Sequence, residues 1–221
     1  MPLPRRGSYS NRTGRYPRLP RLVLAFLTVI GSALLATVPT ATATASPHKH
    51  LRRHRGAQAA SACAGANDPV GSTPSQVIKT AVVCLVNQQR AAHHLPALVA
   101  SPLLNRSAQG WTNVMVTSDQ FTHGANFASR ISAAGYVWRM AGENIATGFD
   151  TPRGVVRAWM ASTGHCQNIL NPTYRNIGTG ISARAVRGFA TGPGTWTQDF
   201  ALGMNSSPPS NNFGPADGCP Y

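Results

Sequence analysis

Acidic side chains are scarce in this sequence, which has six Asp and Glu against 20 Lys and Arg in 221 residues and a formal net charge of +14. Ten of the bases lie in residues 1–60, where no acid occurs. From Ser61 onward there are ten bases and six acids, which leaves a net charge of only +4. Such a charge is ordinary for a soluble domain, so we expect no specific nucleic-acid partner.

Several common catalytic motifs are absent. The chain has no Gly-x-Ser-x-Gly, no His-Glu-x-x-His and no phosphate-binding P-loop, which excludes the most easily recognised hydrolases, zinc proteases and nucleotide hydrolases. The stretch Gly178-Thr-Gly-Ile-Ser-Ala183 matches a dinucleotide-binding pattern. However, no helix can follow it before the Gly- and Pro-rich stretch 187–194, so we do not expect a dinucleotide site.

Only one long apolar run occurs, from Leu22 to Val38, and it follows six Arg. This layout is typical of a secretory signal, and we expect residues 1–45 to be a signal peptide cleaved after Ala45, with Ala41 and Ala43 as alternatives. An uncleaved anchor is the other interpretation. The run is shorter than the roughly 20 residues that a spanning helix prefers, so we predict a secreted protein with no membrane span after cleavage.

The stretch after the expected cleavage site is basic. Residues 48–55 read His-Lys-His-Leu-Arg-Arg-His-Arg, without apolar periodicity. We interpret residues 46–72 as a solvated, flexible linker, although such a stretch can also bind anionic wall polymers or lipid headgroups.

Four cysteines follow, and none forms a Cys-x-x-Cys pair. Export favours disulfides over a zinc site made of thiolates. Four cysteines allow three connectivities. We favour Cys63 with Cys84 and Cys166 with Cys219, because each bridge would tie a terminal segment to the body of the protein.

The remaining sequence predicts an α+β domain over residues 73–203, followed by a tail at 204–221 that Cys219 ties down. Apolar residues at helical spacing predict four helices, and two stretches of alternating residues then predict two antiparallel strands. Thr73 is the expected N-cap of the first helix, with Gln76 completing a capping box, and Ser101-Pro and Thr151-Pro give the same start signal for the second and fourth helices. We expect the helices at about 73–94, 101–119, 126–134 and from 151, and the strands at 178–186 and 195–202.

Three side chains stand out as candidates for a site. Glu143 is the only Glu in the chain and lies in an apolar context, which favours a buried or cleft position. His123 and His165 each lie next to a Gly in an expected loop, where side chains can point into a shared cleft. Together they suit a divalent metal or proton transfer. They can equally be hydrogen-bonding groups that stiffen the loops.

Five short motifs occur in one order: Phe121-Thr-His123, Ala-Gly-Glu143-Asn-Ile-Ala, Thr-Pro-x-x-Val-Val-x-x-Trp159-Met, Gly-His165-x-x-Asn-Ile-Leu and Trp196-Thr-Gln-Asp-Phe. Together, over residues 77–203, they resemble the bacterial branch of the CAP superfamily. This is the group of cysteine-rich secretory, antigen 5 and pathogenesis-related 1 proteins, also called SCP-like extracellular proteins.

The resemblance implies an α-β-α sandwich with a small antiparallel sheet and about four helices. It also implies a cleft lined, in eukaryotic members, by two His and two acids. His123, Glu143 and His165 match three of these positions, whereas Ser162 stands where the second acid would fall. One acid fewer implies modest metal affinity. Cys166 and Gln167 replace an Arg-Ala pair common in bacterial relatives, which suggests a disulfide directly beside the site.

We therefore expect a secreted, monomeric binding protein rather than an enzyme. His123, His165 and Glu143 would hold a divalent cation such as zinc, with Ser162 as a cleft neighbour. The cleft would bind a cell-envelope lipid, sterol-like molecule or glycan. The alternative is a metal-dependent hydrolase in which the two His are ligands and Glu143 is the catalytic base.

Overall fold

The computed structural model of the chain describes residues 63–207 together with residues 218 and 219. The expected signal peptide, its cleavage site and the basic stretch lie outside the described residues. The fold is α+β, as predicted. Within the described part, five helices and four strands follow in the order α1 (Ser75–Ala92), β1 (Val99–Ala100), α2 (Pro102–Ser118), α3 (Phe127–Ala133), β2 (Trp138–Thr147), α4 (Pro152–Met160), α5 (Thr163–Ile169), β3 (Asn176–Ser182) and β4 (Thr195–Gly203).

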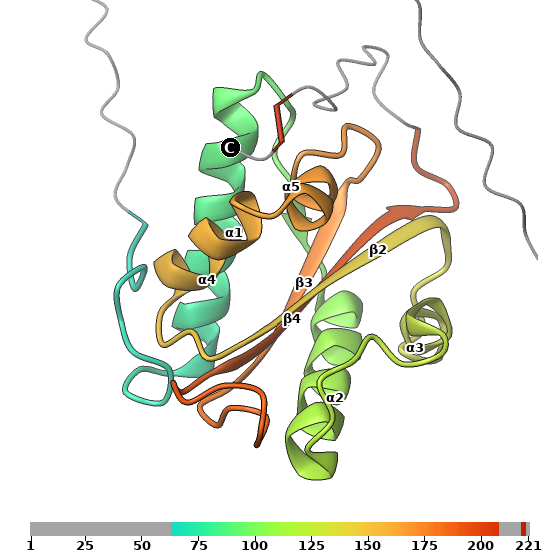
Figure 1. Cartoon of the computed structure of the whole chain (residues 1–221). Helices are drawn as coiled ribbons and strands as arrows, with labels where there is room; N and C mark the ends of the chain where they lie inside the picture. Colours follow the sequence, from blue (N-terminus) through green and yellow to red (C-terminus); the bar gives the residue numbers. More distant parts are fainter. Residues whose placement is uncertain (1–62, 208–217, 220–221) are drawn as a thin grey trace, which may run out of the picture. The chain divides into compact units, whose positions relative to one another are not determined.

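The four strands form one sheet in the order β1-β3-β4-β2. Strand β4 pairs antiparallel with both β3 and β2, whereas the short β1 pairs parallel with β3. Helices α1, α4 and α5 lie on one side of the sheet, and α2 and α3 lie on the other (Figure 1). This is the implied α-β-α sandwich, and it leaves β2 as an edge strand.

Two glycines in β3 let α2 pack directly against the sheet. A Cβ atom on Gly178 would overlap the backbone carbonyl carbon of Leu104. One on Gly180 would overlap the carbonyl group of Ala108. Both added Cβ atoms would lie far closer to the α2 backbone than van der Waals contact allows. Only glycine at these two positions therefore permits α2 to pack so close to β3. The Gly-x-Gly motif therefore serves the contact between helix and strand.

A buried arginine joins α1 to the segment that follows α5. Arg90 is fully buried, and its guanidinium donates hydrogen bonds to the carbonyl oxygens of Pro96, Ile169 and Asn171 at 2.8 Å each. Burial lowers its pKa to about 10, so it stays charged at neutral pH. This contact holds the C-terminal end of α5 against α1.

The four predicted helices are present, and the second and fourth begin at the expected caps. The Ser101 hydroxyl accepts a hydrogen bond from the Leu104 amide, and the Thr151 hydroxyl accepts one from the Gly154 amide. The cap predicted for the first helix was wrong. The Thr73 hydroxyl donates instead to Asp68 at 3.0 Å, and α1 has no side-chain cap.

Three elements were not predicted, namely the short strand β1, strand β2 and the short helix α5, and the expectation that all helices precede the strands was wrong. Strand β2 lies between α3 and α4, and the short helix α5 follows α4. Residues 142–146 of β2 are all buried, so both faces of the strand are covered and no alternation of polar and apolar residues marks it.

Residues 63–72 belong to the domain, so the linker boundary expected at residue 72 was placed too late. Cys63, Ala66 and Val70 are buried, and the Val70 amide donates to the carbonyl oxygen of Asp150. The anchoring comes from the Cys63–Cys84 disulfide, which joins this segment to α1. The second favoured disulfide, Cys166–Cys219, is also present.

The close packing of α2 on β3 gives a test with a matched control. Gly180→Ala forces a Cβ against the α2 backbone and should lower the free energy of unfolding by about 2 kcal/mol. Gly110 lies inside α2, and no atom comes within 4 Å of a Cβ added there. Gly110→Ala should therefore raise the free energy of unfolding by about 0.5 kcal/mol. Urea unfolding followed by circular dichroism measures both. Equal effects of the two variants would contradict the role assigned to the β3 glycines.

Candidate functional site

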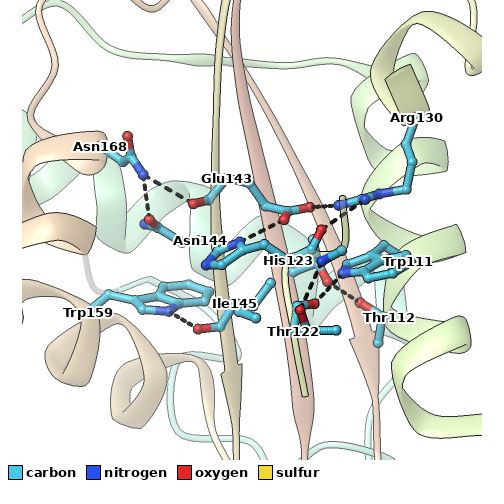
Figure 2. Close-up of polar contacts among 12 residues, drawn as sticks. Trp111, Thr112, Thr122, His123, Arg130, Glu143, Asn144, Ile145, Trp159 and Asn168 are labelled. Carbon is cyan, nitrogen blue, oxygen red and sulfur yellow. Dashed lines mark hydrogen bonds and ion pairs between the residues drawn. The ribbon is translucent and has the colours of Figure 1, made fainter. Parts of the chain in front are cut away.

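Glu143 is a buried carboxylate on the edge strand. Its side chain is 1% exposed. One oxygen, Oε1, accepts a hydrogen bond from Nδ1 of His123 at 2.8 Å, and Oε2 pairs with Nη2 of Arg130 at 2.5 Å (Figure 2). Because a carboxylate only accepts hydrogen bonds, Nδ1 of His123 carries the proton in this contact. The charge of Glu143 is thus paired, as burial requires.

Arg130 in α3 holds this part of the site together. Its guanidinium carbon lies 3.9 Å from the ring centroid of Trp111 in α2, and its Nη1 donates to the carbonyl oxygen of His123 at 3.0 Å. The indole nitrogen of Trp111 in turn donates to the carbonyl oxygen of Thr122 at 2.9 Å. One arginine therefore connects α2, α3, the loop that contains His123, and β2.

No local motif in the sequence predicts the role of Arg130. The only signal was indirect, since a buried Glu143 requires a cationic partner. The sequence does not say which of the bases beyond Ser61 supplies it. Only the fold brings α3 alongside β2.

Asp199 is a second buried carboxyl beside Glu143. The two residues are directly opposite each other in the β2–β4 pairing, and Asp199 is 1% exposed. Burial raises the pKa of Asp199 to about 7, and the Glu143 charge acts in the same direction, whereas Ser107 and Arg130 oppose the shift. The pair therefore holds a proton at mildly acidic pH.

On the other side of β2, Ser162 and His165 form a second pair. Ser162 is the N-cap of α5, and its hydroxyl lies 2.9 Å from Nδ1 of His165. Burial lowers the pKa of His165, and the charge of His123 lowers it further. His165 is therefore neutral at neutral pH, with Nε2 as the ring nitrogen left for a ligand.

Helices α4 and α5 are attached to the edge strand through its carbonyl oxygens. Asn168 donates to the carbonyl oxygen of Glu143 at 3.1 Å, and Trp159 donates to that of Ile145 at 3.3 Å (Figure 2). The Asn144 side chain donates to the carbonyl oxygen of His165 at 3.2 Å. The motif from Gly142 to Ala146 thus fixes the strand, the short helix and His165 together.

A cavity of about 300 Å³ lies beside the second pair. Most of its wall is apolar, and Ser162 and His165 are polar groups in it. The apolar wall includes Phe121, Ile145, Phe149, Trp159 and Phe189. The cavity is thus mainly apolar, with Thr147, Ser162 and His165 as its polar lining residues.

The structure joins the predicted residues in two pairs rather than in one set. His123 contacts Glu143, and His165 contacts Ser162. Among residues 63–207 and 218–219, no three His, Cys, Asp or Glu side chains are grouped so that they could hold a metal ion. Both oxygens of Glu143 are already engaged. The arrangement suits a carboxylate that orients the imidazole of His123.

The profile of the cysteine-rich secretory protein family, abbreviated CAP, matches residues 83–200. The chain belongs to the CAP family. Its likeness extends to the uncharacterized protein YkwD of Bacillus subtilis, to which it is 35% identical over 151 residues. That match covers 65% of this chain and 55% of YkwD, so the chain spans about half the length of this relative.

Two solved structures have the same fold as this CAP domain. One is an extracellular protein containing an SCP domain from Bacillus anthracis, at a TM-score of 0.50 and 22% identity, covering 59% of this chain and 44% of that one. The other is an outer surface protein from Borrelia burgdorferi, at a TM-score of 0.50 and 18% identity, covering 55% of this chain and 90% of that one. In the part of the chain described here, no helix is long and apolar enough to cross a membrane.

The Glu143–Asp199 pair predicts that stability depends on pH. Because the folded state raises the pKa of Asp199 above its usual value near 4, stability should fall as the pH rises from about 4 to 7. The expected loss is on the order of 4 kcal/mol, because the pKa rises from near 4 to about 7 on folding. Asp199→Asn removes this titration and should flatten the profile, whereas the exposed Asp150→Asn should not. Urea unfolding at several pH values measures this, and identical slopes for wild type and Asp199→Asn would contradict it.

Proposed function

We propose that this CAP-domain protein is secreted and binds an amphiphilic cell-envelope molecule in the cavity beside α5. We further propose that His123 and His165 hold a divalent cation near the polar end of that ligand. The extracellular and outer-surface descriptions of the two similar structures support secretion, as do the two disulfides. The mainly apolar cavity with a few polar lining residues is the observation that carries the proposal.

The lining of the cavity favours a lipid or sterol-like ligand over a glycan. A glycan presents hydroxyl groups on most of its surface, and each one needs a hydrogen-bonding partner when it is buried. Aromatic and aliphatic side chains instead stabilise an apolar body, by about 25 cal/mol for each Å² removed from water. Ser162 and His165 would then bind the polar end of the ligand.

The cation half of the proposal rests on the chemistry of the two His residues. A neutral imidazole is the form that binds a metal, and the lowered pKa of His165 favours it. Glu143 accepts a hydrogen bond from Nδ1 of His123 and so directs Nε2 away from itself, which is the usual arrangement of a carboxylate behind a metal-binding His. A bound cation would supply positive charge for an oxygen of the ligand.

The hydrolase alternative is less well supported. It requires Glu143 to take a proton from water, but one of its oxygens is paired with Arg130 and the other accepts from His123. Its side chain is also 1% exposed, so water does not reach it readily. We therefore favour binding over catalysis, and our expectation of a monomer stays a prediction.

Filling the cavity tests the binding proposal. Ala158 in α4 lines the cavity, so Ala158→Trp should occupy it with an indole ring. The fluorescent amphiphile 11-(dansylamino)undecanoic acid should bind wild type saturably, and Ala158→Trp should weaken binding at least tenfold. Ala92→Trp, on the exposed end of α1, is the control and should bind as wild type does. No saturable binding to wild type, or equal binding by all three proteins, would contradict the proposal.

A further inference from the structure

Two loops that are distant in sequence meet beside the cavity. One is residues 119–122, directly after α2, and the other is residues 183–194, between β3 and β4. The side chain of Asp119 joins them. Its Oδ2 lies 2.9 Å from Nη2 of Arg187, and its Oδ1 accepts the Arg187 amide at 3.4 Å. We refer to the contact between Asp119 and Arg187 as the latch.

The backbone places Asp119 for this role. It is the C-cap of α2 and has a φ of 53°, in the left-handed region that non-glycine residues rarely adopt. This conformation ends α2 and turns the chain toward the second loop. On the second loop, Val186 is fully buried and packs in the cluster with Met115 and Ile145. Both loops are therefore anchored to the body of the domain.

An aromatic pair lies just beyond the latch. Phe121 is two residues after Asp119, and Phe189 is two residues after Arg187. Their ring centroids are 5.9 Å apart and their planes are tilted by 51°, which is a favourable aromatic contact. Both rings line the cavity, and Phe189 is 57% exposed. A ligand in the cavity would bury part of that exposed ring.

We propose that Phe121 and Phe189 form an aromatic clamp that selects one extended apolar chain, and that the latch holds the two rings in register. This inference rests on the proposed function, because it assigns the selectivity of the same cavity. At about 300 Å³, the cavity is at the lower end of the range for small-molecule sites. One chain fits such a volume better than a two-chain lipid or a fused-ring body.

The latch acts by positioning rather than by the strength of its ion pair. Arg187 is 80% exposed and Asp119 is 31% exposed at the side chain, so solvent screens the charges. Its effect is to hold Phe189 opposite Phe121. Loss of the latch should therefore weaken ligand binding less than loss of either ring.

Binding of 11-(dansylamino)undecanoic acid to the full chain tests the clamp. Phe121→Ala and Phe189→Ala should each raise Kd about tenfold, and Arg187→Gln should raise it two- to fivefold. Phe189→Leu, which keeps an apolar side chain but no ring, should fall between Phe189→Ala and wild type. Val137→Ala is the matched control, since Val137 is 69% exposed and does not line the cavity. Circular dichroism checks that each variant is folded.

Competition tests the selection of one chain. Dodecylphosphocholine, with one chain, should displace the dansyl probe, whereas dilauroylphosphatidylcholine and cholesteryl hemisuccinate should be at least tenfold poorer competitors. If Ala158→Trp abolishes probe binding while the clamp variants keep the wild-type Kd, the clamp is wrong and the proposed function stands. Equal competition by the three lipids would overturn the selection of one chain. No probe binding to wild type would overturn both proposals.

Discussion

The arrangement of the site depends on one buried carboxylate on an edge strand. Glu143 is the only Glu in the chain, and its burial requires the cation that Arg130 supplies. That requirement brings α3 against β2, because Arg130 comes from the middle of α3. The second oxygen of Glu143 then fixes the ring of His123. Removing one member of this chain of contacts leaves another buried polar group without its partner, which is costly in a low-dielectric interior.

The same strand also positions Ser162 and His165, through the helices on its opposite side. The carbonyl oxygens of Glu143 and Ile145 accept hydrogen bonds from Asn168 and Trp159, so α5 and α4 are held to the strand edge. The Cys166–Cys219 disulfide lies on α5 directly beside His165, which agrees with the expectation of a bridge next to the site. The edge strand therefore links two pairs, His123 with Glu143 and His165 with Ser162, and the cavity adjoins the second pair.

Local sequence signals predicted much of the helical part of the fold. The Ser101-Pro and Thr151-Pro motifs mark real helix starts, because a cap and a proline act through neighbouring residues only. Strand β2 was not predictable in this way, since its central residues are buried on both faces and include Gly, Glu and Asn. The burial of Glu143 was predicted from its apolar context, whereas Arg130 and the Asp199 neighbour depend on contacts between distant segments. The structure places Glu143 against His123 and Ser162 against His165, and the binding of a cation by His123, His165 and Glu143 stays a prediction.

The most direct test of this account is the affinity of the full chain for zinc, measured by isothermal titration of wild type and of three single variants. With Glu143 as a positioning residue, one zinc ion should bind per chain, and His123→Ala or His165→Ala should abolish binding. Glu143→Gln should then weaken binding about tenfold without abolishing it. His94→Asn, on the surface, serves as the control. Abolition of binding by Glu143→Gln, or unchanged binding in both His variants, would contradict the account.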